Sequence, residues 1–396
     1  MINKKKTVSL KNLVVLTLLI PAVFSIAVGV KNAMNPDYGS ADFQWDASRI
    51  LLMRLNPYQL TLSTDPAPTD KYTPDKLTAN QVPSCLILLW PYAVFDWSTA
   101  KVLWLLSNLL FTAILVIYSF KLFFPDAGWN VKFTVLSLFV IGTPWRNLVG
   151  IGQHTLFSLA FFVLAAYYSD KKQKFLSGIL LGISYFKYTT IFPMLPYFLY
   201  KKRYMPIAIS FGLHGILHLL ASFWLGEWPH TLVFQSLEVS SRHSLNGYID
   251  ILAVFSHMGM DLPTIVGLLP ALAIMLGTAV IAIKAKRKDD LAAMTLVGMV
   301  SIIVVYHRRI YDFVVLLFPL MFVFKYWKKN LLNTLLTLCL GSAFIVDRIF
   351  YSVGPKLDGM GLEWIENIYF YIFVTIWYSS IAVCGARLLH SENAES

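Results

Sequence analysis

The chain has 396 residues, of which 57% are hydrophobic and only 14% are charged. Soluble domains are less apolar and about a quarter of their residues are charged, so this composition excludes an ordinary soluble enzyme and a disordered chain. The three cysteines lie far apart in apolar stretches, without metal-ligand spacing or a disulfide pattern. The sequence therefore predicts an all-α polytopic membrane protein in which residues 1–396 form one integral membrane domain.

Two explanations account for the formal net charge of +11. A basic chain can bind nucleic acid, but Lys and Arg also gather at the cytoplasmic ends of membrane helices. The sequence contains no Cys/His finger and no RNA-binding motif of the RNP type. We therefore expect membrane lipid, and no nucleic acid, among the partners.

The first apolar run, residues 12–30, follows Lys4, Lys5, Lys6 and Lys11. These cations predict a cytoplasmic N-terminus. A cleaved signal peptide is the alternative to a membrane anchor. We favour an uncleaved anchor, because the run is long and no convincing cleavage site follows it.

Residues 31–97 then form an outer loop. Its polar part, residues 31–82, contains a run from Ala41 to Leu55 whose apolar side chains recur at helical spacing, which predicts an amphipathic helix lying on the membrane. Residues 83–95 are too short to span and contain two prolines, so we expect a second interfacial or re-entrant helix there.

Eleven further apolar runs follow, which makes about 12 spans and places both termini in the cytoplasm. They cover, approximately, residues 98–122, 131–149, 154–169, 175–187, 189–200, 204–224, 263–283, 290–306, 310–325, 331–350 and 367–389. Residues 225–262 become a second outer loop. The basic clusters at residues 171–174, 201–203 and 284–288 fall on the inside, as the positive-inside rule requires.

The runs 175–187 and 189–200 are short for spans. The basic clusters on either side of them both favour the cytoplasm, so the chain between must cross and return, with Lys187 at the turn. Short, broken helices are tolerated in a membrane where they line a cavity.

Charged side chains inside membrane helices are costly and need a partner or a function. Lys187 is either a lysine that extends to the membrane surface or a contact for an anion. His307, Arg308 and Arg309 place three potential cations between two apolar runs, with Asp312 close behind. An Arg–Asp pair is one interpretation. One carboxylate does not neutralise three cations, so an anionic ligand is the other.

Three further features on the outer side are candidates for ligand contacts. The turn at residues 150–154 ends in Gln153 and His154, and its glycines let backbone approach a ligand or simply form a tight turn. His243 lies in the second outer loop, where polar side chains are also commonly solvated. Asp42 and Asp46 are four residues apart and share one face if their helix includes Asp42.

Four segments carry a family resemblance. They are Asp42-Phe43 with Leu55-Asn56-Pro57-Tyr58; the run from Pro83 to Trp104; Gly152-Gln153 with the run from Ser177 to Lys187; and Tyr306-His307 with Tyr311-Asp312. In order and spacing they resemble the polytopic glycosyltransferases of family 87, within the GT-C superfamily, over approximately residues 38–325.

The resemblance implies a GT-C-like bundle that uses a polyprenyl-phosphate-linked sugar, mannose-like or arabinofuranose-like, as its donor. The acceptor would be a glycan or glycolipid on the extracytoplasmic face of the bacterial cytoplasmic membrane. Asp42 would serve as the general base of an inverting reaction. The expected substrate contacts are Asp46, Tyr58, Gln153, His154, Lys187, His243, His307, Arg308 and Arg309. We expect no cofactor, and the sequence leaves metal dependence open.

Other functions remain as alternatives at this point. A lipid-carrier flippase would use the same buried cations without a base, but the sequence has no visible inverted repeat. An O-antigen ligase or polymerase would have a larger late outer loop than residues 225–262 or 351–366. A non-catalytic assembly protein is the third alternative.

Overall fold

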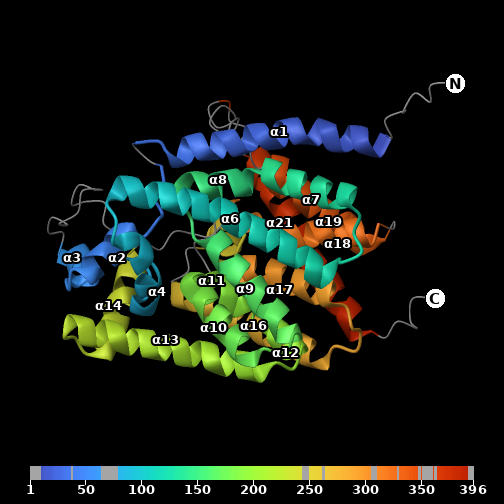
Figure 1. Cartoon of the computed structure of the whole chain (residues 1–396). Helices are drawn as coiled ribbons and strands as arrows, with labels where there is room; N and C mark the ends of the chain where they lie inside the picture. Colours follow the sequence, from blue (N-terminus) through green and yellow to red (C-terminus); the bar gives the residue numbers. More distant parts are fainter. Residues whose placement is uncertain are drawn as a thin grey trace.

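A computed structural model describes residues 10–36, 39–63, 79–242, 249–260, 264–304, 310–327, 330–346, 349, 360 and 364–390. This part of the chain is entirely helical (Figure 1). The N-terminal half contains α1 (Leu10–Ala33), α2 (Trp45–Leu52), α3 (Pro57–Ser63), α4 (Pro83–Leu88), α5 (Trp90–Ala93), α6 (Trp97–Phe123), α7 (Trp129–Ile141), α8 (Thr143–Ile151), α9 (Thr155–Asp170) and α10 (Lys174–Ser184).

The chain then continues through η2 (Tyr185–Lys187), α11 (Tyr188–Ile191), η3 (Phe192–Met194), α12 (Pro196–Tyr200), α13 (Tyr204–Leu225), α14 (Pro229–Arg242) and α15 (Ile251–His257). The last elements are α16 (Thr264–Lys284), α17 (Asp290–Val304), η4 (Ile310–Leu316), α18 (Leu317–Lys325), α19 (Leu331–Gly341), η5 (Ser342–Val346) and α21 (Trp364–Leu389). The expected all-α fold is thus confirmed for the described residues.

Five helices in the described ranges are long and apolar enough to cross a membrane. They cover Val15–Ala33, Trp97–Phe123, Lys174–Met194, Tyr204–Leu225 and Trp364–Leu389. The pair α7 and α8, bent by 60°, is a sixth candidate if it counts as one broken span. Several shorter apolar helices accompany them, namely Thr155–Asp170, Leu269–Lys284, Asp290–Val304 and Leu331–Val346. The chain is therefore a multi-pass membrane protein.

Ion pairs join the ends of four helices at one side of the bundle. Lys201 Nζ lies 3.3 Å from Asp170 Oδ1 and 2.6 Å from Asp290 Oδ2, so the ends of α9 and α12 meet the start of α17. Arg387 Nη2 lies 3.4 Å from Asp289 Oδ2, which adds the end of α21. We call the side defined by these five residues the basic end.

The segment from α10 to α12 crosses toward the other side and returns, as the sequence predicted for its two short legs. Its midpoint, Lys187, donates its backbone N–H to Ser158 Oγ near the start of α9, at 2.9 Å. Its end, Lys201, is paired with Asp170 at the end of α9. The chain between Lys174 and Lys201 therefore runs along α9 and back.

Two glycines let α10 pack closely on α13. A Cβ atom on Gly178 would lie 2.5 Å from Ile209 Cβ, and one on Gly182 would lie 2.7 Å from Leu213 Cδ2. Small residues four apart permit close helix contact in membranes, where dispersion and not hydrophobic burial holds helices together. The glycine spacing thus fixes α13 against the broken segment that carries Lys187.

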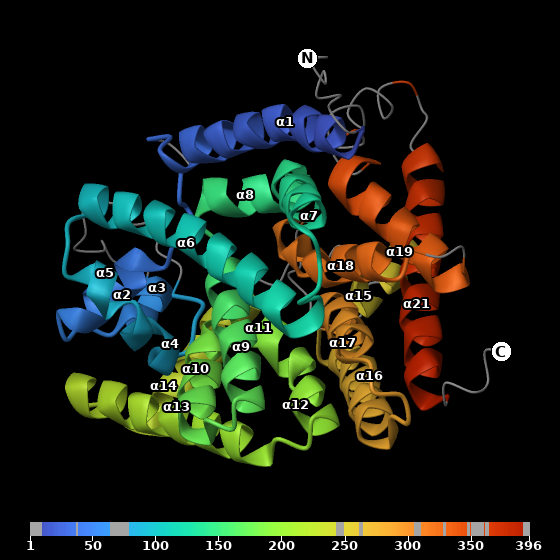
Figure 2. The ribbon, with the colours of Figure 1, turned by 45° about the vertical axis from the view of Figure 1, so that its right-hand side comes forward.

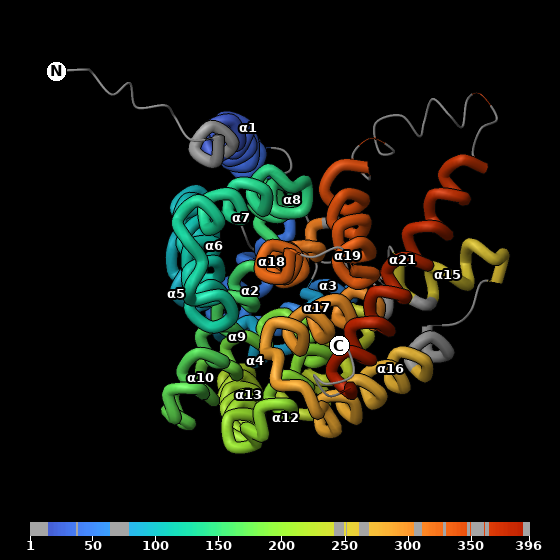
Figure 3. Tube along the Cα trace, turned by 90° about the vertical axis from the view of Figure 1, so that its right-hand side faces the viewer, coloured from blue at the N-terminus to red at the C-terminus, as the bar shows by residue number. Residues whose placement is uncertain are grey.

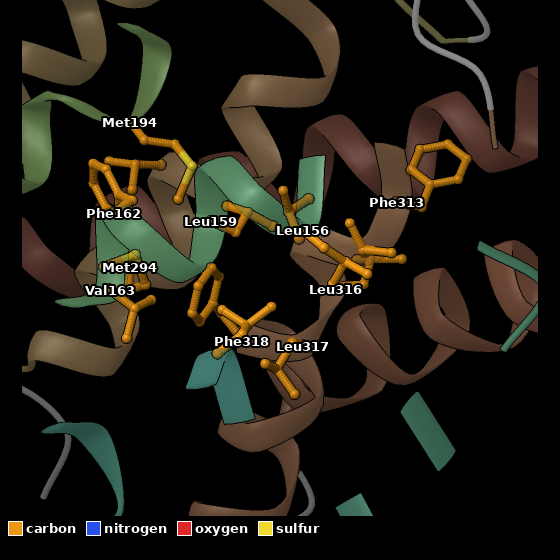
Figure 4. Packing of buried hydrophobic residues seen from close by; sticks show 14 of the residues in the cluster. Leu156, Leu159, Phe162, Val163, Met194, Met294, Phe313, Leu316, Leu317 and Phe318 are labelled. Carbon is orange, nitrogen blue, oxygen red and sulfur yellow. The ribbon is translucent and has the colours of Figure 1, made fainter. Parts of the chain in front are cut away.

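The centre of the bundle is filled by helices that are apolar on every side. All residues of α17 from Leu291 onward are buried, as are Leu317–Val323 of α18. α18 contacts α7, α17 and α19, and Figure 3 shows it surrounded by these helices. Figure 4 shows part of this core, in which Leu159 and Phe162 of α9 lie beside Met294 and Phe318.

Short helices gather at the opposite side of the bundle. α2, α3, α4 and α14 lie together at the left of Figure 1, and Figure 2 shows α2 to α5 as one group. α2 contacts α3, α4 and α5, and α14 contacts α3, α4 and the end of α13. We call the side that holds α2 to α5 and α14 the loop end.

The first outer loop differs from its sequence prediction in two ways. The expected helix from Ala41 to Leu55 is shorter, since α2 begins at Trp45, and most of its side chains are buried against protein. The apolar face of this helix is therefore covered by α3, α4 and α5. Residues 83–95 form two short helices, α4 and α5, in place of one.

Candidate active site at the loop end

The turn between α8 and α9 is built around Gly152. This residue has φ +69°, a left-handed conformation that glycine adopts without strain. Its carbonyl accepts a hydrogen bond from Trp104 Nε1 of α6 at 2.8 Å, so the turn is tied to a neighbouring helix. These contacts therefore hold the backbone of residues 150–154 in one conformation.

The segment from Ser40 to Phe43 packs directly on this turn. Ser40 N–H donates to Gly150 O at 3.0 Å, and Asp42 N–H donates to Ile151 O at 2.9 Å. A Cβ atom on Gly152 would lie 3.0 Å from both Cα and Cβ of Ser40. Only glycine allows this approach, which explains the Gly152-Gln153 motif and fixes the backbone of Asp42.

Phe43 anchors the same segment from the other side of Asp42. Its side chain is fully buried and stacks on the Trp104 ring, with 4.5 Å between ring centroids and 4° between planes. Aromatic pairs of this kind add to the stability that burial provides. Asp42 itself is only partly buried, so the contacts on either side of it fix the backbone of a residue that keeps some exposed surface.

His154 lies between this segment and the interior of the bundle. Its side chain is 2% exposed, and its ring lies 4.3 Å from Phe186 and 5.3 Å from Trp104 between centroids. The Gln44 N–H points at His154 Nε2 from 3.5 Å. The side-chain oxygen of Gln153 accepts a hydrogen bond from the backbone N–H of the next residue, His154. His154 thus touches both the Asp42 segment and the residue before Lys187.

A buried ion pair lies beside the next residue, Thr155. Lys187 Nζ donates to Asp312 Oδ1 at 2.6 Å, and Thr155 Oγ1 donates to the same oxygen at 2.8 Å. The two charged side chains are 9% and 0% exposed. Nζ also lies 5.1 Å from the centre of the Tyr311 ring. The carboxylate and the ring compensate the desolvated ammonium, and the Thr155 hydroxyl stabilises the carboxylate.

The three polar residues Lys187, Asp312 and Thr155 all lie in irregular backbone or at a helix end. Lys187 ends the short helix η2, with φ −107° and ψ 70°. Asp312 lies in η4, and Thr155 is the first residue of α9 after the glycine turn. Such breaks are typical where membrane helices surround polar groups. The sequence anticipated the break at Lys187, whereas the partner of this lysine came from a different part of the chain.

The remaining residues proposed from the sequence lie apart from this group or outside the described residues. Asp46 is 3% exposed and lies in the first turn of α2. Because α2 starts at Trp45, Asp42 precedes it, and the expected shared helical face of the two carboxylates was wrong. His243, His307, Arg308 and Arg309 fall outside the described residues.

Tyr58 lies in a hydrophobic cluster at the loop end. Its side chain is fully buried in a cluster with Leu51, Leu86 and Leu232, and its OH donates to Gln81 O at 2.6 Å. Burial raises the pKa of Tyr58 well above its usual range, so the phenol remains a hydrogen-bond donor. Its expected contact with substrate stays a prediction.

Sequence reasoning missed Thr155 and Ser158, and the one partner it offered for Asp312 was a nearby arginine. The signal for Asp312 was present, since a carboxylate within an apolar run needs a cation. The sequence could not show that this cation is Lys187, because 125 residues separate Lys187 from Asp312. Among the described residues, no group of three His, Cys, Asp or Glu side chains is arranged to hold a metal ion.

The ion pair leads to a prediction about stability. We expect Lys187→Met to lower the free energy of unfolding by about 3–5 kcal/mol, because it removes the counter-ion of a buried carboxylate. Lys187→Met combined with Asp312→Leu removes both charges and should recover most of this loss. Denaturant unfolding of the purified protein in detergent measures both.

The pair formed by Lys201 and Asp290 is a suitable control, since its side chains are 20% and 33% exposed. Breaking this pair should cost only about 0–1 kcal/mol. A double variant of Lys187 and Asp312 that is no more stable than Lys187→Met would contradict the proposed coupling.

Comparison with known proteins identifies the family. The family model described as "Glycosyltransferase family 87" matches residues 82–306, which include His154, Thr155 and Lys187. Asp42 precedes the matched range and Asp312 follows it. No curated protein matches the chain. Because the family model covers more than half of the chain, the protein belongs to glycosyltransferase family 87 and is a membrane-embedded glycosyltransferase.

Proposed function

We propose that the protein transfers a mannose-like or arabinofuranose-like sugar from a polyprenyl-phosphate-linked donor to a glycan or glycolipid acceptor, with inversion and with Asp42 as the base. The observation that carries this proposal is the packing of the Asp42 segment on the Gly152 turn, two residues from His154 and three from Thr155. This packing holds a carboxylate at the loop end, next to a turn that leads to a buried cation.

The reaction requires one proton acceptor. The acceptor hydroxyl transfers its proton to the Asp42 carboxylate while its oxygen attacks the anomeric carbon of the sugar. The bond between that carbon and the phosphate oxygen breaks, and the electron pair leaves with polyprenyl phosphate. A phosphate is a good leaving group that needs positive charge and no general acid.

Burial favours Asp42 over Asp46 as the base. Asp42 is partly buried, whereas Asp46 is 3% exposed within α2. A general base must come within hydrogen-bond distance of the substrate hydroxyl. The partial exposure of Asp42, which precedes α2, therefore supports it as the base.

Lys187 is the cation that we assign to the leaving phosphate. Asp312 and Thr155 would hold its ammonium in place before the donor binds, so little reorganisation would be needed during the reaction. The resulting electrostatic stabilisation is largest where water is excluded, and Lys187 is buried. His307, Arg308 and Arg309 precede η4 in the sequence, and we retain them, with His243, as further candidate contacts.

We further propose that the single domain crosses the membrane twelve times, with the basic end and both termini in the cytoplasm. The chain directions support this count. α6 and α9 run the same way, since Trp104 contacts His154 and Tyr118 contacts Tyr167. Besides the five long helices and the bent pair, the count takes as spans the four shorter apolar helices, the segment formed by η4 and α18, and a second short leg after Lys187. The donor would then be used on the outer face of a bacterial cytoplasmic membrane.

Cysteine labelling tests this orientation. A cysteine introduced at Ser98 should react with a membrane-impermeant thiol reagent added to intact cells, whereas one at Asp126 should react only after the cells are opened. The three native cysteines are buried and give a low background. A cytoplasmic Ser98 would exclude an extracytoplasmic lipid-linked donor.

The sharpest test of the mechanism is Asp42→Asn. The variant keeps size and hydrogen bonding but cannot take up the proton, so we expect the transfer rate to fall about 10²–10⁴-fold. We expect folding to be preserved, because the backbone hydrogen bond of residue 42 and the stacking of Phe43 are unchanged. Transfer from a panel of polyprenyl-phosphate sugars by the purified protein measures the rate.

Asp96→Asn makes the same chemical change at an exposed carboxylate of the same loop. Asp96 caps α6 by accepting from the Thr99 N–H, and asparagine caps equally well, so this variant should transfer sugar normally. If Asp46→Asn is inactive and Asp42→Asn is active, the role of base passes to Asp46. Full activity in both would exclude a carboxylate base in this loop.

The role of Lys187 is tested in a background that keeps the fold. The double variant Lys187→Met with Asp312→Leu lacks the cation without leaving a buried charge. We expect its kcat/KM for the lipid donor to fall about 10- to 100-fold, the value of a hydrogen bond to a charged group. A similar double change at Lys201 and Asp290 should leave transfer intact. Wild-type transfer in the first variant would restrict Lys187 to a structural role.

A further inference from the structure

α14 has one face packed on protein and another that is exposed and carries the large apolar residues Phe234 and Leu237, with His230 one turn before Phe234. Leu232, Ser236 and Val239 are at most 1% exposed, and the two apolar ones join the cluster that contains Tyr58. On the other side of the helix, Phe234 is 67% and Leu237 is 54% exposed. Helical periodicity separates these two faces.

The helix before α14 also exposes apolar side chains. This candidate span exposes Phe211, Ile216 and Leu219, and near its end Phe223 is 86% exposed. The chain turns at Gly226, which has φ +71°, and Trp228 follows with 73% exposed. α14 then turns away from the axis of α13 (Figure 1). Exposed apolar side chains thus occur on a candidate span and on the helix at the loop end that directly follows it.

We propose that α14 is an interfacial helix whose exposed face, defined by Phe234 and Leu237, lies in the lipid at the membrane surface. Lipid is the occupant that the structure favours, because α14 follows directly on a candidate membrane span that itself exposes large apolar side chains. Tryptophan is enriched at the water–lipid boundary, and Trp228 stands at the junction between the two helices. Glu238, which is also exposed, lies beside this face toward water.

This position gives α14 a function in the enzyme. Asn56 Nδ2 donates to Gln235 Oε1 at 2.9 Å, and Ser240 Oγ donates to Asn80 O at 3.3 Å. Both contacts tie α14 to the first outer loop, which also carries Asp42. A helix held at the lipid surface therefore sets the height of that loop above the membrane. The lipid anchor predicted for residues 41–55 is thus assigned to the second outer loop.

Spin labels on single introduced cysteines test this proposal in full-length protein reconstituted into phosphatidylcholine vesicles. Labels at Phe234→Cys and Leu237→Cys should collide more with oxygen, which dissolves in lipid, than with a water-soluble nickel chelate. Ile216→Cys in α13 is the lipid reference, and Asp126→Cys between α6 and α7 is the water reference. Glu238→Cys should resemble the water reference.

Two results would overturn the proposal. Labels at Phe234 and Leu237 that behave like the one at Asp126 would show a solvated helix. Labels at both positions that are shielded from oxygen and nickel alike would show that protein, such as a second copy of the chain, covers this face. All substitutions are at exposed positions, so folding should be preserved in each variant.

Discussion

The charge of Lys187 is the constraint around which the interior is arranged. An ammonium in an apolar bundle requires a counter-ion and further stabilising contacts. Asp312 and the Tyr311 ring supply them, and Thr155 donates a hydrogen bond to the Asp312 carboxylate. These groups come from the broken segment after α10, from η4 and from the start of α9. Each of these segments departs from regular α-helix, because a continuous helix would not bring its polar group to the same point.

The second constraint is the close approach of backbone at Gly152. It joins the interior site to the outer loop, since the same turn bonds the backbone of Asp42 and leads directly to Thr155. The outer loop in turn packs on α14, and α14 continues from α13, which fits against the glycines of α10. A chain of contacts thus runs from the proposed base, around the loop end, and back to the helix that leads to Lys187.

Local sequence patterns were sufficient for much of the fold and for part of the site. The sequence predicted that the chain reverses direction after Lys187, because basic clusters flank two apolar runs that are too short to be ordinary spans. The length of α2 was not readable, since the apolar spacing from Ala41 to Leu55 reflects burial against α3, α4 and α5 and not a longer helix on lipid. The family resemblance, confirmed over residues 82–306, rested on the glycine and lysine spacing that these contacts now explain.

The sequence by itself determined a membrane-embedded, all-helical chain and the residue types in its site. Hydropathy and charge act locally, so they remain visible in a linear pattern. Only the tertiary structure decided that Lys187 pairs with Asp312, that Asp42 precedes α2, and that α14 and not α2 exposes an apolar face. Each of these outcomes depends on contacts between residues far apart in the chain, where many pairings satisfy the same local pattern and packing selects one.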